Sequence, residues 1–303
     1  MGRYSQKSVY LRKMKILVTG ANGQLGKALK AAITMYQTLD IFIFADRTQL
    51  DISQTKHIQS YLDRYPVDAI VNCAAYTSVD QAECERESAD QINHLSVKQL
   101  AVIAHYRRIK LVHISTDYVF DGSSSIPYTE DQKAYPLSVY GASKRQGEQA
   151  IENIMDHNAL IIRTSWMYSE YGKNFVKTIL ELGLKKSQID VIDDQIGTPT
   201  YALDLAHVII IIIQSQYFRQ ASFITQLYHY ANQESCSWHE FAQTIFQMAN
   251  INCEAIPITT SQYRLPASRP VYSVLNTDKI KKDFNLEIPK WKISLKKCID
   301  RLR

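Results

Sequence analysis

A tyrosine and a lysine, Tyr140 and Lys144, lie four residues apart, shortly after Pro136, a residue that suits the start of a helix. On a helix, this spacing places both side chains on one face. A lysine ammonium beside a phenol stabilises the phenolate and lowers a pKa that is about 10 in water, which makes the tyrosine a usable acid or base at neutral pH. Such pairs are common on protein surfaces, so the meaning of this one depends on the residues that accompany it.

Three glycines, Gly20, Gly23 and Gly26, directly follow an apolar run at residues 15–19 and open a segment with helical periodicity. Glycines at such a junction permit a tight turn, let backbone amides approach a pyrophosphate, and let the helix pack close to the strand. The helix N-terminus adds a favourable field for negative charge. The position of these glycines at the first strand-to-helix junction indicates a dinucleotide site, and a tight turn without a ligand is the alternative.

An acidic and a basic residue follow the next apolar run. Asp46 lies 20 residues after Gly26, where a carboxylate can accept hydrogen bonds from the adenosine ribose and favours NADH. Arg47 comes next and could neutralise a 2′-phosphate, so the pair is compatible with NADPH or NADH. A solvated turn pair is the alternative. Asp51 and Ile52 could border the adenine.

Short β-branched apolar runs alternate with longer segments of helical periodicity over residues 14–165. Strands that are apolar on both faces are typical of a parallel sheet covered by helices on both sides. The pattern predicts an α/β fold, with a doubly wound parallel-sheet Rossmann domain over residues 14–165. The expected strands are 15–19, 40–45, 68–74, 110–115 and 159–164, and the expected crossover helices include 26–36 and 82–107.

The pattern becomes irregular after residue 165, which predicts a smaller mixed α/β domain, mainly for substrate binding, over residues 166–303. A strand near 227–231 could return to the main sheet. No low-complexity linker separates the two parts, so we expect a cleft between them as the ligand site. The other expected elements are a strand at 189–192 and helices at 174–182, 204–215 and 238–249.

Composition excludes several classes of protein. The 303 residues are 46% hydrophobic and 21% charged, as in ordinary globular proteins. Residues 1–13 hold four basic residues and no acid, so the rest of the chain has 31 basic and 30 acidic residues, which argues against nucleic-acid binding. We interpret residues 1–13 as an upstream extension without fixed structure. The most apolar run, 208–213, is far shorter than the roughly 20 residues that cross a bilayer, so no membrane partner is expected.

The cysteines and histidines predict no metal site. Their spacing lacks a C-x-x-C pair, and the odd number of cysteines fits reduced thiols in the cytoplasm better than a disulfide framework. His113, His229 and His239 show no ligand spacing with acids, so we expect them to be structural. The cysteines are Cys73, Cys84, Cys236, Cys253 and Cys298.

Several motifs in register resemble those of the extended short-chain dehydrogenase/reductases, and within them the dTDP-4-dehydrorhamnose reductase family. The resemblance spans nearly everything from Met14 onward. It rests on TGANGQLG (19–26), NCAAYTSVDQAE (72–83), HISTDYVFDG (113–122), SVYGASKRQGE (138–148), RTSWMY (163–168), DQIGTPTYALDLA (194–206) and RPVYSVLN (269–276).

The resemblance implies a role for each matching residue. Tyr140 would donate a proton to a keto oxygen as hydride arrives from the nicotinamide, Lys144 would hold the nicotinamide ribose and lower the pKa of the tyrosine, and Thr116 would hydrogen-bond the same oxygen. Thr116, Asp117 and Trp166 would face the sugar, and Arg269 could pair with a diphosphate, although a core tryptophan and a structural ion pair are the alternatives. The cofactor would be lined by Gly20, Gly23, Gln24, Leu25, Gly26, Asp46, Arg47, Asp51, Ile52, Ala74, Ala75, Tyr76, Thr77, Tyr140 and Lys144.

The resemblance also implies a reaction, the reduction of the 4-keto group of dTDP-4-dehydro-β-L-rhamnose by NADPH or NADH, in the synthesis of cell-surface polysaccharide. A nucleotide-sugar dehydratase or epimerase is one alternative, but sugar dehydratases of this superfamily carry a glutamate where this chain has Tyr118. A non-catalytic NADP-binding regulatory subunit is the other alternative. We expect a monomer or a homodimer without a bridging metal, because a glutamate that related metal-bridged dimers use is replaced at Lys27-Ala28-Leu29.

Overall fold

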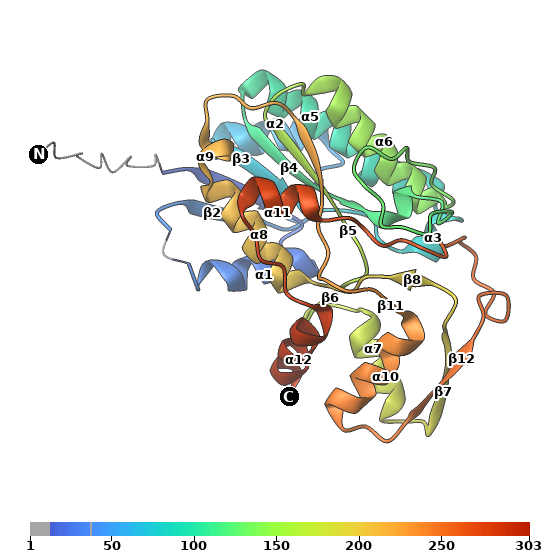
Figure 1. Ribbon diagram of the computed structural model, residues 1–303. Coiled ribbons are helices and arrows are strands. Elements are labelled where there is room, and N and C mark those ends of the chain that lie inside the picture. The colour runs from blue at the N-terminus through green and yellow to red at the C-terminus, as the bar shows by residue number, and fades with distance from the viewer. Residues whose placement is uncertain (1–12, 37) are drawn as a thin grey trace, which may run out of the picture.

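The computed structural model describes residues 13–36 and 38–303, so the expected N-terminal extension lies almost wholly outside the described residues. A six-stranded sheet with every neighbouring pair parallel forms the centre of the molecule (Figure 1). The predicted α/β doubly wound fold is therefore confirmed. In spatial order the strands are β10 (Gln226–His229), β5 (Ala159–Thr164), β4 (Lys110–Thr116), β3 (Ala69–Asn72), β1 (Lys15–Thr19) and β2 (Ile41–Ala45).

Helices cover both faces of this sheet because alternate strand residues point to opposite sides. Ile16 and Val18 pack into the cluster that includes α1 (Gln24–Ile33) and α8 (Ala202–Gln214). Leu17 packs on the other face, in the cluster of α2, α5 and α6. The latter helices are α2 (Thr55–Arg64), α5 (Ser96–Arg107) and α6 (Val139–Ile154).

The strand order reverses at β1, which has β2 on one side and β3 on the other. In open α/β sheets, ligands bind outside the carboxyl ends of the strands at such a switch point. The glycine-rich turn after β1 and the segments after β3 and β4 therefore meet at one edge of the sheet.

The chain after residue 165 returns to the main sheet. β10 pairs with β5, so the strand expected near 227–231 joins the sheet at its edge. α8 packs on α1, and its apolar run at 208–213 is buried except for the half-buried Ile211. Two short helices, α9 (Gln216–Arg219) and α11 (Asp278–Phe284), lie beside these elements. Across the part of the chain that the structure describes, no helix has both the length and the apolarity to cross a membrane.

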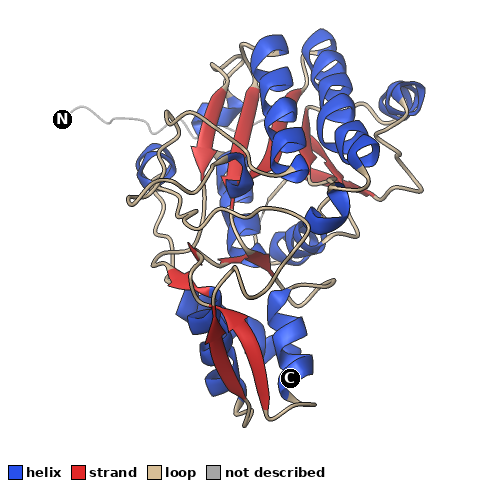
Figure 2. Cartoon of the chain, turned by 90° about the vertical axis from the view of Figure 1, so that its right-hand side faces the viewer, coloured by secondary structure: helices blue, strands red, loops and turns tan. Residues whose placement is uncertain are grey.

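A smaller lobe lies below the main sheet (Figure 2). Its centre is a parallel pair, β7 (Gln188–Ile192) with β12 (Glu254–Ile258), packed against α10 (Trp238–Ala249) and α7 (Phe175–Gly183). The remaining elements of this part are β6 (Met167–Tyr168), β9 (Thr200–Tyr201), β8 (Ile196–Gly197), β11 (Cys236–Ser237) and α12 (Trp291–Leu302).

Over the expected helix at 82–107, a short helix ends at Ala82 and a second one runs from Arg86 to Arg107 without a gap, with one π-helical turn in it. α6 approaches it so closely that a Cβ at Gly147 would lie 2.2 Å from Asn93 O. The π-helical turn at Asn93 aims the buried Asn93 side chain at the main chain of Tyr76 and at Ser143 Oγ, at 2.9 to 3.0 Å. The elements before α5 are α3 (Val79–Ala82), α4 (Arg86–Asp90) and η1 (Gln91–Leu95).

Candidate active site

A cleft lies at the carboxyl ends of the strands, between the sheet and the smaller lobe. It consists of two adjoining hollows of about 500 Å³ and 400 Å³ that share Asn22, Gly23, Cys73 and Ala75. The larger hollow contains Gln24, Leu25, Thr77, Thr116, Asp117, Tyr140, Lys144 and Trp166 from the expected site residues. The smaller one contains Gly20, Asp46, Arg47, Asp51, Ile52, Ala74 and Tyr76.

The glycine-rich turn after β1 has the geometry that a dinucleotide needs. Gly20 has φ +64°, and a Cβ there would lie 2.7 Å from Ala74 N. Gly26 does not line the cleft, but a Cβ on it would lie 2.5 Å from Gly20 O, so it allows α1 to start directly against the turn. The amides of the first turn of α1 thus face an open hollow, where they can bind a pyrophosphate.

The two residues expected at the adenosine ribose differ in their surroundings. Asp46 accepts four hydrogen bonds, from Asn22 Nδ2, the Thr48 amide and hydroxyl, and the Gln49 amide. These bonds, that from the Thr48 hydroxyl first, lower the pKa of Asp46. Arg47 is exposed and makes no hydrogen bond or ion pair within residues 13–36 and 38–303, so its guanidinium is available to a ligand phosphate.

Tyr140 and Lys144 lie on one face of α6, as their spacing predicts. Ser138 caps this helix by accepting a hydrogen bond from Gly141 N at 3.1 Å. A Cβ at Gly141 would lie 2.1 Å from Tyr118 O, so the glycine lets α6 approach the end of β4 closely. Thr116, at that end, hydrogen-bonds Tyr140.

The electrostatics of Tyr140 differ from the expectation. Burial raises the pKa of Tyr140 to about 12, and the hydrogen bond from Thr116 lowers it only in part. Lys144 is not bonded to Tyr140 in the described structure: its Nζ lies 2.6 Å from Ile114 O and 3.3 Å from His113 Nε2. Burial lowers the pKa of Lys144 to about 8, against the opposing effect of Glu148 and Cys73. Tyr140 is therefore a protonated phenol at neutral pH, ready to act as an acid.

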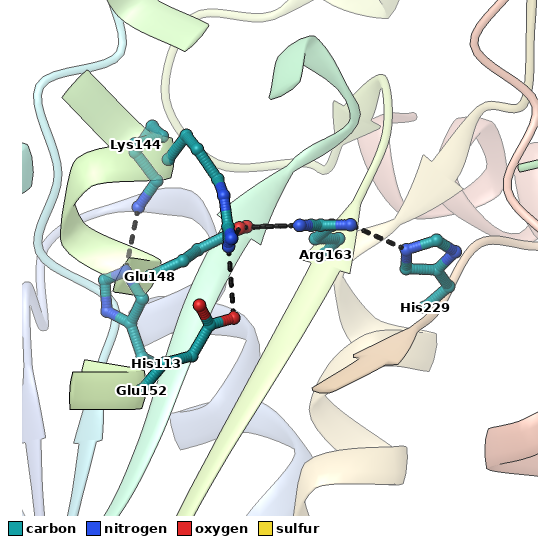
Figure 3. Close-up of polar contacts among 7 residues, drawn as sticks. His113, Lys144, Glu148, Glu152, Arg163 and His229 are labelled. Carbon is teal, nitrogen blue, oxygen red and sulfur yellow. Dashed lines mark hydrogen bonds and ion pairs between the residues drawn. The ribbon is translucent and has the colours of Figure 1, made fainter. Parts of the chain in front are cut away.

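A buried ion pair joins α6 to β5 near the cleft (Figure 3). Arg163 on β5 holds Glu148 on α6 through two hydrogen bonds of 2.9 Å and 2.7 Å, and both side chains are buried. Burial alone would raise the pKa of Glu148, but Arg163, together with Ser115 and Arg145, outweighs it and the pKa is lowered. His229 lies at 3.4 Å from Arg163 on the far side. The pair fixes α6 against the sheet four residues beyond Lys144.

Of the two residues that follow Thr116, Tyr118 is poorly suited to removing a ring proton. Burial raises the pKa of Asp117 to about 7, despite hydrogen bonds from Ser273 and Thr116. Tyr118 follows, and its ring meets that of Tyr140 edge to face at 5.6 Å. Burial also raises the pKa of Tyr118 far above neutral, so it is no base at physiological pH.

The opposite wall of the cleft comes from the smaller lobe. Trp166 has φ +45° and its ring stacks on that of Trp238 at 3.5 Å, with an angle of 8° between the planes. A Cβ at Gly197 would lie 2.4 Å from the Trp166 ring, so Gly197 makes room for it. Trp166 therefore faces the cleft and packs in the lobe at the same time. Sequence reasoning missed Trp238, whose place in the wall depends on this long-range contact.

The segment 169–174 joins this wall to the cofactor turn. Gln24 Oε1 accepts hydrogen bonds from Ser169 Oγ at 2.9 Å and from Asn174 Nδ2 at 3.0 Å. Lys173 is exposed, lines the cleft and makes no hydrogen bond or ion pair with another described residue. A Cβ at Gly172 would lie 3.4 Å from Gln24 Cγ, so the segment that carries Lys173 runs beside the start of α1.

Arg269 does not line the main cleft. Its guanidinium pairs with both carboxylate oxygens of Asp80, at 3.0 Å and 2.7 Å, which is the structural ion pair considered as the alternative. It borders a separate groove of about 390 Å³ in the smaller lobe, where Tyr118 and Trp238 are also found. Because these two aromatic residues line the cleft as well, the groove continues it.

Comparisons with known proteins agree with this geometry. The family model described as "RmlD substrate binding domain" matches residues 14–303. The dTDP-4-dehydrorhamnose reductases of Aggregatibacter actinomycetemcomitans and Sinorhizobium fredii are 38% and 35% identical to this chain, covering 93% and 94% of it and 97% of each relative. A crystal structure of dTDP-4-dehydrorhamnose reductase from Bacillus anthracis in complex with NADP is 37% identical, with a TM-score of 0.88 over 96% of this chain and 100% of that chain.

These matches run through the turn after β1, the end of β4, α6 and the smaller lobe alike, and they confirm the family that the motifs predict. The chain belongs to the RmlD substrate binding domain family.

Proposed function

We propose that this protein reduces the 4-keto group of dTDP-4-dehydro-β-L-rhamnose to the alcohol, with NADPH or NADH as the reductant, for the synthesis of cell-surface polysaccharide. One observation carries the proposal: the glycine-rich turn, Thr116 and Tyr140 open into one cleft, so a cofactor site and a proton donor are adjacent. The names of the relatives give the substrate class.

The residues of the cleft fit a nicotinamide cofactor. Gly20, Gly23 and the first turn of α1 would hold the pyrophosphate, and Lys144 would hold the nicotinamide ribose. Arg47 would bind a 2′-phosphate, which is a reason to expect stronger binding of NADPH than of NADH. When bound, the cofactor supplies hydride.

Tyr140 and Thr116 would act on the keto oxygen. The Tyr140 hydroxyl would donate its proton there, and Thr116, which lies within hydrogen-bond reach of Tyr140, would turn its single hydroxyl hydrogen to the same oxygen. The phenolate left on Tyr140 lies in a buried place that disfavours negative charge, and the nearby Lys144 ammonium offsets this cost. Asp117 and Trp166 would face the sugar, because both line the same hollow.

The nucleotide part of the substrate would lie in the groove that continues the cleft. Its aromatic and aliphatic lining suits a base, and Arg269, with its charge shared with Asp80, would contact the diphosphate. We also propose a cytoplasmic location, since the five cysteines are free thiols, and action as a monomer or homodimer, since a single chain forms the cleft.

The test is to mix the purified protein with NADPH and dTDP-4-dehydro-β-L-rhamnose, to follow the absorbance of the reduced nicotinamide, and to identify the product by NMR. We expect NADPH loss and dTDP-L-rhamnose. A parallel reaction with dTDP-glucose and NAD should give no 4-keto-6-deoxy sugar, because Tyr118 stands where elimination needs an acid or base. Formation of that product, with no NADPH loss in the first reaction, would favour a dehydratase instead.

A further inference from the structure

His113 was expected to be structural, yet its ring lies directly behind Lys144 (Figure 3). It occupies the middle of β4, is completely buried, and contacts one polar partner on each side. Its Nε2 lies 3.3 Å from Lys144 Nζ, and its Nδ1 lies 3.1 Å from the Asn72 side-chain amide. The chain of contacts continues from Asn72 to Thr19 Oγ1.

The three N–H donors of Lys144 need hydrogen-bond acceptors, and His113 can supply one of them. An ammonium group has three N–H donors and no acceptor. Ile114 O takes one, at 2.6 Å, and an unprotonated His113 Nε2 can take a second. The third is left for the cleft, where the ribose and Tyr140 phenolate would lie. Without an acceptor at Nε2, one of the N–H groups would point into the protein interior with no hydrogen-bond partner. Such an unsatisfied buried donor costs free energy.

This arrangement requires one tautomer of His113. Burial and the positive charge of Lys144 hold the pKa of His113 well below its usual value, so the ring is neutral and carries one hydrogen. If Nε2 accepts from Lys144, that hydrogen is on Nδ1, and Asn72 must present its carbonyl oxygen to the ring. In the structure Asn72 Nδ2 faces the ring and Asn72 Oδ1 accepts from Thr19 Oγ1. Exchanging these two ends, which only their partners distinguish, gives the orientation that the tautomer requires, with Asn72 Nδ2 donating to Thr19 Oγ1.

We propose that His113 is a positioning residue for Lys144: its Nε2 holds the ammonium so that one N–H faces the cleft, and Asn72 with Thr19 selects the ring tautomer that permits this. The inference rests on the proposed function, because it assumes that Lys144 holds the cofactor ribose and stabilises the Tyr140 phenolate.

Other charges around Lys144 do not replace this contact. Glu148 acts on it from its own helix, Cys73 acts on it from the end of β3, and Tyr140 lines the same hollow. Burial raises the pKa of Cys73 to about 12, so the thiol is neutral near pH 7. Glu148 is bonded to Arg163. His113 and Ile114 O are therefore the groups that orient the ammonium directly.

Two variants of His113 test separately the contact of Nε2 with Lys144 and the contact of Nδ1 with Asn72. In His113→Gln, the longer amide can place an oxygen near the former Nε2 and keep the acceptor for Lys144. In His113→Asn, the shorter amide reaches only toward Asn72. We expect His113→Asn to weaken NADPH binding about tenfold, as for the loss of a hydrogen bond to a charged group, and His113→Gln to recover most of this loss.

The pH dependence of NADPH affinity gives a readout that a merely structural role would not change. A hydrogen bond to the ammonium favours the charged form, so its loss should lower the pKa of Lys144 further below about 8. NADPH affinity should then fall off at lower pH in His113→Asn than in the wild type, by about one pH unit. Thr19→Val, at the far end of the chain, should shift it in the same direction by less.

Three results would overturn the proposal: unchanged affinity and pH profile in His113→Asn, equal losses in the Gln and Asn variants, or a loss that follows thermal stability alone. If His113→Asn does not fold, Thr19→Val decides, and an unshifted profile in it counts against the proposal. These measurements need no sugar. A wild-type protein that binds NADPH without reducing the keto sugar would contradict the proposed function and leave this test valid.

Discussion

The two walls of the cleft are built in different ways. The wall formed by β4, β5 and α6 carries polar side chains that are almost completely buried, with Lys144 and Arg163 at 2% exposure. The wall from the smaller lobe carries exposed residues such as Gly172 and Lys173, and touches the cofactor turn through the Gln24 side chain. We infer that the two walls have different functions. The wall formed by β4, β5 and α6, the rigid wall, holds the catalytic groups in place, and the wall from the smaller lobe, the lobe wall, recognises and encloses ligands.

Replacing Tyr140 on the rigid wall should have the largest effect. Tyr140→Phe keeps the ring and removes the proton donor, so we expect kcat to fall about 100- to 10,000-fold, with NADPH affinity nearly unchanged. Steady-state kinetics and cofactor titration measure the two quantities. Tyr118→Phe is the matched control, and its kcat should fall less than about tenfold, because its hydroxyl contacts Arg269. If Tyr140→Phe keeps more than about a tenth of the wild-type rate, Tyr140 is not the donor.

Breaking the buried pair tests the rigidity of the same wall. Glu148→Gln leaves the buried Arg163 without its counter-charge, and we expect a loss of about 3–5 kcal/mol in the free energy of unfolding in urea. Glu152→Gln, which removes a half-exposed partner of Arg145, should cost less than about 1 kcal/mol. Equal losses in the two variants would contradict the account.

The pH dependence of stability follows from the same pair. The folded-state pKa of Glu148 is lowered, so its contribution is complete above the unfolded pKa and disappears as the pH falls through the folded value. The stability difference between the wild type and Glu148→Gln should therefore shrink in acid. A difference that grows as the pH falls would show that the carboxylate is not the stabilised form.

Arg47 tests selectivity at the adenosine end. Arg47→Ala should weaken NADPH binding by about 1.5–3 kcal/mol and leave NADH binding nearly unchanged, because only NADPH carries the 2′-phosphate. We expect the wild type to use both cofactors. Equal losses for the two would refute a phosphate contact.

Lys173 tests whether the lobe wall acts on the cofactor from across the cleft. Its charge is exposed and screened by salt, so Lys173→Met should raise the Kd for NADPH only about two- to fivefold, and less at high ionic strength, with kcat unchanged. A fall in kcat with unchanged Kd would instead show that Lys173 acts in the chemical step and not in cofactor binding.

The two walls also differ in how far the sequence predicts them. The strand ends, the glycine turn and the Tyr140–Lys144 pair are local patterns with a defined spacing, and the structure places all of them at one edge of the sheet. Trp238, Lys173 and Asn93 were not predicted, because their roles depend on contacts between segments far apart in the chain. Their only local signals are an aromatic residue at a helix start, a lone lysine in a loop and an asparagine inside a helical pattern.

Two expectations failed for physical reasons that spacing does not show. The i, i+4 pattern brings Lys144 to the face of Tyr140, but the ammonium is held by Ile114 O and His113, and burial rather than lysine dominates the pKa of Tyr140. The helix expected over 82–107 begins only at Arg86, and it contains a π-helical turn at Gln91–Leu95, where α6 packs closely and Asn93 turns toward the segment after β3. Both depend on tertiary packing.

Direct transfer of hydride in this cleft to the keto carbon of the sugar can be followed with NADPH deuterated at both C4 positions of the nicotinamide. After reaction with dTDP-4-dehydro-β-L-rhamnose, NMR and mass spectrometry of the product should show one deuterium, at C4 of the sugar, for each NADPH consumed. Product without deuterium at C4, or turnover without net consumption of NADPH, would contradict the account.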